Sequence, residues 1–429
     1  MGFFGARIGG GFLNRIIFRF LKLNPENVQH RNAYYLVVEL FWAGILGSAA
    51  TFNAAFALRL EATNTDVGYL SSIPALLAVL VSLPAGRFLQ ARARRTPLIL
   101  WALFINRLNY LLLAAVPWLG RLNIPLGSLA VGVLVFATIP AHFFNVGWIP
   151  LLAEAVNERS RAGLVTARMM ISYAVTALFS FLFGQMLSYV TFPYNYALMY
   201  VVGFAASMVS MVYLLKLKIP DAVPVVRQSG AGLNLARIRQ AITDHPGLTR
   251  ITINTFCYGL GLWLAAPLYI LRYVRQLDAT DAWIGLSGTV ATLAAIIATP
   301  VWRKTIASWG KSATLKRTIV LVGLFPIAAG LSPSLTLILL AVAFNNIVSA
   351  GVNLSHFTTL LEVMPEENRP GYTSWYISLV NTGAFICPLL GVAIADRLGI
   401  APTLVICGVL SILGATSFWW WPVKVPEKR

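Results

Sequence analysis

Long apolar blocks alternate with short polar segments along almost the whole chain. A helix needs about 20 mostly apolar residues to cross the hydrocarbon core of a bilayer. Barrel strands would be only about 10 residues long, with apolar and polar side chains in alternation, so helices fit these blocks and strands do not. The pattern predicts about twelve transmembrane helices, at residues 34–58, 67–89, 97–118, 125–152, 163–190, 194–216, 248–271, 282–302, 315–331, 334–361, 371–395 and 402–421.

The composition supports the same fold class, an all-α membrane protein. Of the 429 residues, 58% are hydrophobic and 11% are charged, and the mean hydropathy is +0.74. An average soluble domain carries about 25% charged residues. A soluble protein with so few charged side chains would have almost no polar surface to present to water.

Several kinds of chemistry are not indicated. The net charge of +18 is spread over alternate loops rather than gathered into one stripe, which argues against nucleic-acid binding. The three cysteines have no disulfide or metal-ligand spacing. Neither a phosphate-binding loop nor a hydrolase motif is present. We therefore expect no cofactor, no metal, no ATP and no enzymatic activity.

The distribution of Lys and Arg predicts the orientation. One set of chain ends and alternate loops holds 26 of them, and the other set of loops holds 5: Arg59, Arg121, Arg272, Arg275 and Arg397. Cytoplasmic loops of membrane proteins carry the excess of basic residues. Both termini are therefore expected in the cytoplasm, with the protein in the cell membrane.

The chain also resembles itself. Five positions after the fourth span recur after the tenth at an offset of 208 residues: Asn145, Glu154, Glu158, Arg161 and Gly163 match Asn353, Glu362, Glu366, Arg369 and Gly371. Such a register at equivalent sites indicates duplication of a six-helix unit. We expect a basic amphipathic segment at 1–33, a first half at 34–216, a cytoplasmic linker at 217–247, a second half at 248–422 and a short tail at 423–429.

The loop after the second span opens with Gly86 and closes with Arg94 and Arg95. In this it resembles the major facilitator superfamily, whose corresponding loop also contains an acidic residue where this chain has Gln90. The matching loop after the eighth span keeps Gly310 and Lys311. The resemblance covers residues 32–421 and implies two pseudo-symmetric six-helix halves that move against each other.

Ionisable side chains inside spans are costly, so each suggests a role. Glu39 is the one acid placed inside a span, and it is the candidate for proton coupling. Arg107 lies near the middle of the third span and could pair with Glu39 or with an anionic substrate. Arg168 lies about five residues inside the fifth span, and we expect it to extend to the cytoplasmic surface.

In the family, the first, fourth, seventh and tenth helices surround the central cavity. The polar and aromatic residues that the resemblance places there, with Arg107, are our substrate-cavity candidates: Asn53, His142, Asn145, Trp148, Asn254, Tyr258, Trp263, Asn346, Asn353 and His356. The alternative is that these side chains only bond neighbouring helices. The gating-loop candidates are Gly86, Arg94, Arg95, Glu158, Arg161, Gly310, Lys311, Glu366 and Arg369.

The function that the resemblance implies is secondary active transport of a small molecule by alternating access, with proton coupling as one option. An uncoupled facilitator is an alternative, because only one acid lies within the spans. A membrane protein that binds or senses a ligand without transporting it is another. The expected partners are a small-molecule substrate and the lipid bilayer, and the expected oligomeric state is a monomer.

Overall fold

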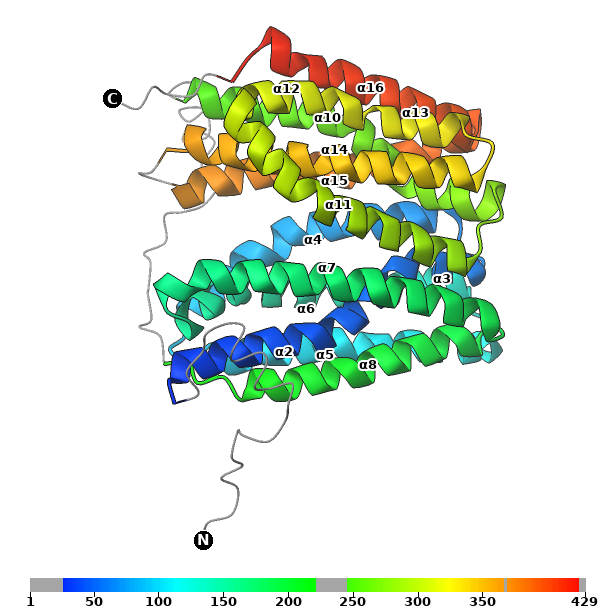
Figure 1. The fold of residues 1–429 in the computed structure, drawn as a ribbon. Coiled ribbons are helices and arrows are strands. Elements are labelled where there is room, and N and C mark those ends of the chain that lie inside the picture. The colour runs from blue at the N-terminus through cyan, green and yellow to red at the C-terminus, as the bar shows by residue number, and fades with distance from the viewer. Residues whose placement is uncertain (1–25, 221–244, 366–368, 424–429) are drawn as a thin grey trace.

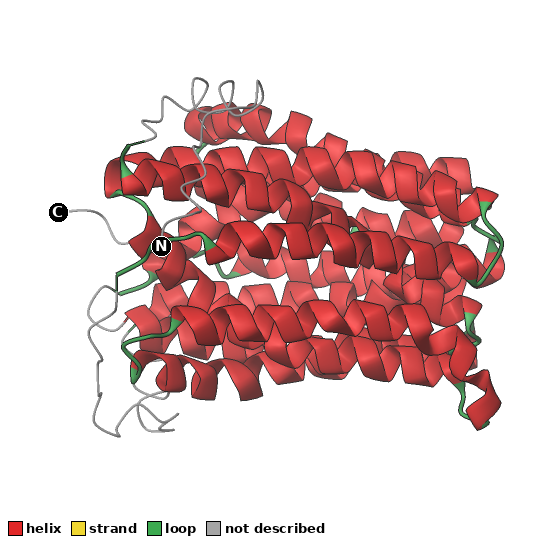
Figure 2. Ribbon diagram, turned by 90° about the horizontal axis from the view of Figure 1, so that it is seen from below, coloured by secondary structure: helices red, strands yellow, loops and turns green. Residues whose placement is uncertain are grey.

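The computed structural model describes residues 26–220, 245–365 and 369–423. Within these ranges the secondary structure is helical, without strands, as Figure 2 shows. Twelve helices are long and apolar enough to cross a membrane, which confirms the predicted number. The amphipathic segment at 1–33 falls mostly outside the described residues, as does most of the linker at 217–247.

The twelve spans are built from fourteen α-helices and three short helical turns. The first six spans are α2 (Val28–Ala49) with η1 (Ala50–Phe52) and α3 (Asn53–Arg59), α4 (Asn64–Gln90), α5 (Thr96–Ala115) with η2 (Val116–Leu122), α6 (Leu126–Ala155), α7 (Glu158–Tyr189) and α8 (Tyr194–Leu215). The last six are α10 (Pro246–Leu271) with η3 (Arg272–Gln276), α11 (Asp281–Trp309), α12 (Lys311–Val322) with α13 (Leu324–Leu331), α14 (Leu335–Val363), α15 (Arg369–Leu398) and α16 (Ile400–Trp420).

The helices pack in the same way in both sets of six. In the first set, here called the first bundle (α2–α8), α2 packs on α7 and α8, and α6 packs on α4 and α5. In the second bundle (α10–α16), α10 packs on α15 and α16, and α14 packs on α11 and α12. In Figure 1, most of the first bundle lies below and the second bundle lies above.

Polar residues at the helix starts explain where several spans begin. Thr63 and Asp66 form a reciprocal capping box on α4, with the Asp66 N–H donating to Thr63 Oγ1 and the Thr63 N–H donating to Asp66. Thr280 caps α11 and accepts from the Trp283 N–H. Each cap begins the second span of its bundle. Thr63 lies three residues before Asp66, and Thr280 lies directly before Asp281.

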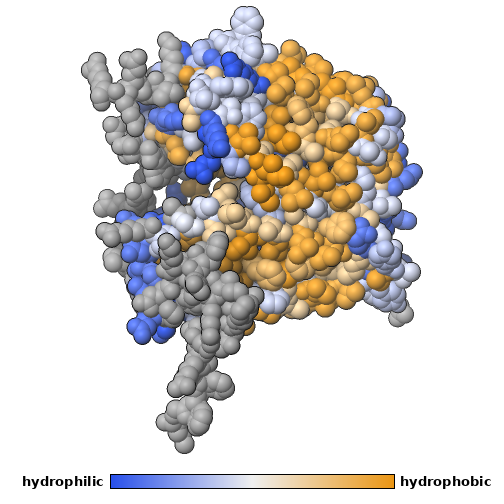
Figure 3. Space-filling model, in the orientation of Figure 1, coloured by the Kyte–Doolittle hydropathy of each residue, from blue (hydrophilic) through white to orange (hydrophobic). Residues whose placement is uncertain are grey.

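The two ends of the described helices differ in charge. We call the end where α2 begins and α16 ends the basic end, because the loop with Arg94 and Arg95 and the loop with Gly310 and Lys311 lie there. Between the two ends the surface is a broad apolar belt (Figure 3). Large apolar residues are exposed on the helices, for example Ile149 at 73% and Ile297 at 69%. Exposed large apolar side chains in such a belt fit contact with lipid.

The largest contacts between the bundles are those of α7 with α11 and of α4 with α15. The α7–α11 contact is made by small residues. A Cβ atom on Gly285 would lie 2.3 Å from the Ser180 carbonyl oxygen and 2.9 Å from the Gly184 Cα. Small residues of this kind let two membrane helices approach backbone to backbone.

Candidate functional site

Polar contacts between the bundles gather at the end opposite the basic end. Tyr196, fully buried on α8, donates to Asp281 Oδ1 of α11 at 2.7 Å. Arg59 of α3 lies 3.6 Å from the same carboxylate oxygen and donates to the Ala279 carbonyl. These contacts join the first bundle to the second.

Further contacts of the same kind lie nearby. Asn64 donates to Asp396 Oδ1 at 2.6 Å and accepts from Arg275. The Ala282 N–H donates to Ser188 Oγ at 3.2 Å. Together with the α7–α11 contact, they close the space between the two bundles at this end.

At the basic end, by contrast, two ion pairs between described residues each lie within a single bundle. Arg95 pairs with Glu154 in the first bundle, and Lys311 pairs with Glu362 in the second. Glu154 and Glu362 are two of the positions that recur at an offset of 208 residues. Figure 3 shows a hollow between the two bundles that opens at this end.

A charged cluster lies inside the first bundle. Glu39 of α2 is 3% exposed, and its Oε1 accepts from Arg168 of α7 at 2.8 Å. Ser210 of α8 donates to Glu39 Oε2 at 2.9 Å and accepts from Arg107 of α5 at 2.8 Å. One carboxylate is thus linked directly or through a hydroxyl to two guanidinium groups.

The expectation for Arg168 was wrong. Its guanidinium does not extend to the surface but turns inward, where it binds Glu39 and the Leu36 carbonyl and lies 5.0 Å from the centre of the Trp148 ring. The buried carboxylate and the aromatic face offset part of the hydration that the guanidinium loses there. Arg107, 3% exposed, also donates to the Ser207 carbonyl.

The other candidates of the first bundle have separate contacts. Asn53 accepts from Tyr200 at 3.1 Å, and His142 Nε2 lies 3.1 Å from the Pro74 carbonyl oxygen. Asn145 is exposed on α6, whereas Trp148 stacks on Phe144 with ring centres 5.2 Å apart. Of these, Trp148 alone contacts the charged cluster through a described interaction.

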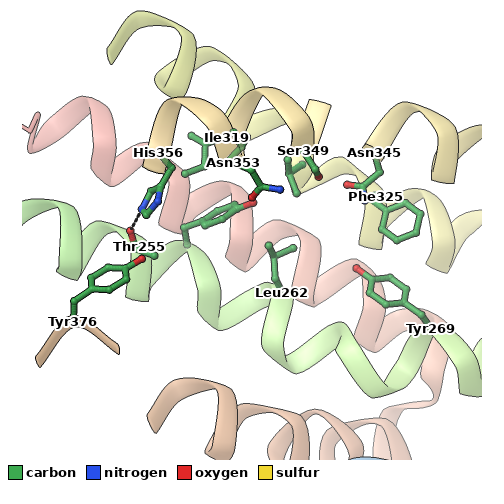
Figure 4. A pocket seen from close by; sticks show the side chains of 13 residues that line it. Thr255, Leu262, Tyr269, Ile319, Phe325, Asn345, Ser349, Asn353, His356 and Tyr376 are labelled. Atoms are coloured by element: carbon green, nitrogen blue, oxygen red, sulfur yellow. Dashed lines mark hydrogen bonds between the residues drawn. The ribbon is translucent and has the colours of Figure 1, made fainter. Parts of the chain in front are cut away.

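The second bundle contains a cavity of about 450 Å³ between α10, α12–α13, α14 and α15. Three predicted candidates line it, namely Tyr258, Asn353 and His356. At one end Thr255 Oγ1 lies 2.7 Å from His356 Nε2, with Tyr376 beside them; Tyr269, Phe325 and Asn345 lie at the other end (Figure 4). The volume falls in the range typical of ligand pockets, roughly 300–1,000 Å³.

Three candidates of the second bundle do not line this cavity. Asn254 is fully buried and donates to the Trp421 carbonyl at 3.0 Å. Trp263 packs against Phe256 and over Gly383. Asn346 donates to the Val342 carbonyl of its own helix at 2.8 Å, and its neighbour Asn345 faces the cavity instead.

Sequence reasoning missed five polar lining residues, namely Thr255, Tyr269, Asn345, Ser349 and Tyr376. The signal on α14 was available, because Asn345, Ser349, Asn353 and His356 follow a spacing of four, four and three residues. That spacing marks one helix face.

The gating candidates are placed in different ways. Glu158 is exposed in the first turn of α7, and Arg161 donates to the Ala153 carbonyl of α6 at 2.8 Å. Gly310 has a φ of +81°, which favours glycine between α11 and α12. Gly86 lies within α4 and Arg94 in the loop after it. Glu366 falls outside the described residues, and Arg369 begins α15.

Known proteins provide a family match. Residues 251–429 match the sequence model described as Major Facilitator Superfamily. No curated protein sequence matches the chain.

Solved structures share the fold over most of the chain. A POT family transporter in complex with 5-aminolevulinic acid aligns with a TM-score of 0.69 at 13% identity, covering 91% of this chain and 96% of that one. The nucleoside transporter NupG aligns with a TM-score of 0.64 at 12% identity, covering 91% and 98%. A bacterial homolog of the human lysosomal transporter Spinster, in an inward-facing and unoccupied conformation, gives 0.59 at 13%, covering 91% and 98%. The twelve spans and this shared fold describe a multi-pass membrane protein with the fold of these transporters, and residues 251–429 carry its sequence match to the Major Facilitator Superfamily.

Proposed function

We propose that the protein is a secondary active transporter that moves a small molecule by rocking its two six-helix halves, at 34–216 and 248–422, against each other. The observation that carries this proposal is the uneven distribution of polar contacts between the bundles. They gather at the end with Asp281 and Asn64, while a hollow opens at the basic end (Figure 3). A carrier open to one side has this form, and the reverse state requires those contacts to break.

The orientation of the open side follows from the basic residues. With the basic end in the cytoplasm, the structure is the inward-open state, and the closed end faces the outside. We further propose that the substrate path runs through the hollow between the bundles, toward the cavity-facing residues of α10 and α14.

Glu39 is proposed as the coupling acid. Its carboxylate is held by Arg168 and Ser210, so a proton on Glu39 would remove the charge that Arg168 now neutralises. Arg168 belongs to α7, the helix whose Ser180 and Gly184 pack against α11 of the other bundle. Twelve residues, or roughly 18 Å of helix, separate Arg168 from Ser180. Protonation in the first bundle can therefore act on the helix that joins the two bundles.

A disulfide across the closed end tests the proposal. Ser188→Cys and Ala282→Cys would be combined in a variant with Cys257, Cys387 and Cys407 replaced by Ala, because Ser188 Oγ already lies 3.2 Å from the Ala282 nitrogen. Proteoliposomes would be given a defined mixture of ¹³C-labelled sugars, amino acids, nucleosides and organic acids, with and without a pH gradient. Uptake would be measured by mass spectrometry.

We expect at least one labelled compound to accumulate, uptake to stop when the disulfide forms, and reduction to restore it. Ser188→Cys alone is the matched control and should transport normally under oxidising conditions. Uptake that persists through a fully formed disulfide would rule out rocking about this end. If no compound enters at all, a binding or sensing protein on this fold becomes the better description.

A further inference from the structure

The cavity of the second bundle extends over several turns of α10. Its walls run along α10 from Thr255 to Tyr269, which is 14 residues or roughly 21 Å of helix. Its volume of about 450 Å³ is modest for that length. An occupant would therefore be elongated or flat rather than round.

Polar groups without protein partners face this cavity. Tyr258, Tyr269, Asn345, Ser349 and Asn353 all line it, and within the described ranges their side-chain polar atoms make no hydrogen bond to the protein. The Asn345 Oδ1 is itself buried. A buried polar atom without a partner costs about 1–3 kcal/mol relative to a bonded one, so such a cluster favours an occupant that bonds it.

The hydrogen-bonding state of His356 can be read from its partner. Thr255 Oγ1 lies 2.7 Å from the Ile251 carbonyl oxygen and 2.7 Å from His356 Nε2. A carbonyl can only accept, and a hydroxyl has one proton, so Thr255 donates to Ile251 and accepts from the His356 Nε2–H. In neutral His356, the remaining ring nitrogen is an acceptor.

The lining disfavours a charged occupant. None of the thirteen residues around this cavity, all within the described ranges, is Asp, Glu, Lys or Arg. An ion moved from water into such surroundings loses hydration without gaining an opposite charge. An uncharged molecule with hydroxyl or amide groups loses less and gains the free side chains.

Aromatic and aliphatic side chains form the rest of the wall. Tyr269 and Phe325 lie with ring centres 4.8 Å apart at one end, and His356 and Tyr376 lie with ring centres 6.2 Å apart at the other. Ile319 and Val322 of α12 complete the apolar side. Flat rings pack well against such surfaces.

We infer that this cavity is a binding site for an uncharged molecule that combines a flat ring with hydroxyl or amide groups. The ring packs at the aromatic ends, and the polar groups bond the face of α14 that carries Asn345, Ser349 and Asn353. This inference deepens the proposed function, on which it rests only for the role of the site in transport. Binding itself does not depend on transport.

The test measures binding of three matched pairs of probes to the purified full chain in detergent, by the shift of its thermal unfolding temperature. The uncharged probes are uridine, nicotinamide and 4-nitrophenyl glucoside. Their charged counterparts are uridine 5′-monophosphate, nicotinate and 4-nitrophenyl glucuronide. Each uncharged probe would be titrated to obtain a Kd for the parent and for Asn345→Leu, Asn353→Leu and Asn346→Leu.

We expect at least one uncharged probe to bind, its charged counterpart to bind at least tenfold more weakly, and both Asn345→Leu and Asn353→Leu to weaken binding at least tenfold. Asn346→Leu is the matched control, since Asn346 bonds its own helix, and it should bind like the parent. Equal binding of the charged counterparts, unchanged binding in both cavity variants, or no binding of any uncharged probe would each overturn the inference. Binding without uptake in the liposome experiment would instead contradict only the proposed transport.

Discussion

The contact between α7 and α11 gives the sharpest prediction. Gly285→Ala adds one carbon atom that would lie 2.3 Å from the Ser180 carbonyl oxygen, where real contacts are not shorter than 3.0 Å. The two helices must therefore separate by about 0.7 Å, the difference between these values. Overpacking of this kind costs about 1–3 kcal/mol. That cost falls on the state closed at this end and is relieved when the bundles part.

The expected result is a shift toward the reverse state by a factor of about 5 to 150, which corresponds to 1–3 kcal/mol. The Ser180 side chain is fully buried while this end is closed, so Ser180→Cys, in a chain without the three native cysteines, reports opening through its rate of alkylation by a membrane-impermeant maleimide. Gly285→Ala should raise that rate in proportion to the open fraction.

Two glycines provide controls. Gly288→Ala would meet the Thr51 Cγ2 at 3.2 Å, a side-chain atom that can move, so its effect should be smaller. Gly47→Ala, where no atom lies within 4 Å, should change nothing. A rate for Gly285→Ala within twofold of the parent, or an equal rise for Gly47→Ala, would refute the argument that this contact holds the end closed.

Three further predictions concern single residues. Glu39→Gln should abolish accumulation driven by a pH gradient while sparing exchange of substrate, measured in proteoliposomes; if accumulation persists, Glu39 is structural. Arg168→Leu leaves Glu39 buried without its ion-pair partner, so it should destabilise the protein by about 3–5 kcal/mol. The unfolding temperature should fall, and combining Arg168→Leu with Glu39→Gln should partly restore it. An unchanged unfolding temperature in Arg168→Leu would contradict the pairing. In Gly310→Ala the added Cβ meets no atom within 4 Å, but alanine must adopt a φ of +81°. This strain should lower the stability of the protein by about 1–3 kcal/mol, measured by the same unfolding temperature. Gly132→Ala, whose Cβ also meets no atom within 4 Å, should leave the unfolding temperature unchanged.

The fold was predictable because the physical demand of the bilayer is severe. Each span must satisfy its own backbone hydrogen bonds, so length and hydropathy alone separate spans from loops. The helix breaks were not predictable in this way. The turn at Ala50–Phe52 interrupts the first span, and Gly323 separates α12 from α13, yet both interruptions lie within apolar sequence.

The partners of the buried side chains could not be predicted, because they lie far apart in the sequence and no local pattern encodes such pairs. Glu39 and Arg168 are 129 residues apart, so the depth of Arg168 in its helix suggested a path to water instead of an inward pair. On α14, one residue changes the direction of a side chain by about 100°. The choice between Asn345 and Asn346 therefore needed the position of α10, which only the packed structure supplies.

The ion pairs at the basic end have a consequence for how the protein responds to its surroundings. Arg95–Glu154 and Lys311–Glu362 each join two groups of one bundle, so in the proposed rocking motion they move with that bundle and stay intact. The charges that must separate, Arg59 and Asp281, lie at the other end, and Arg59 is 36% exposed there. Dissolved salt weakens exposed pairs, and a membrane keeps the solutions on its two sides apart. In the proposed rocking motion, ionic strength in the compartment that Arg59 faces therefore shifts the balance between the two states through this pair.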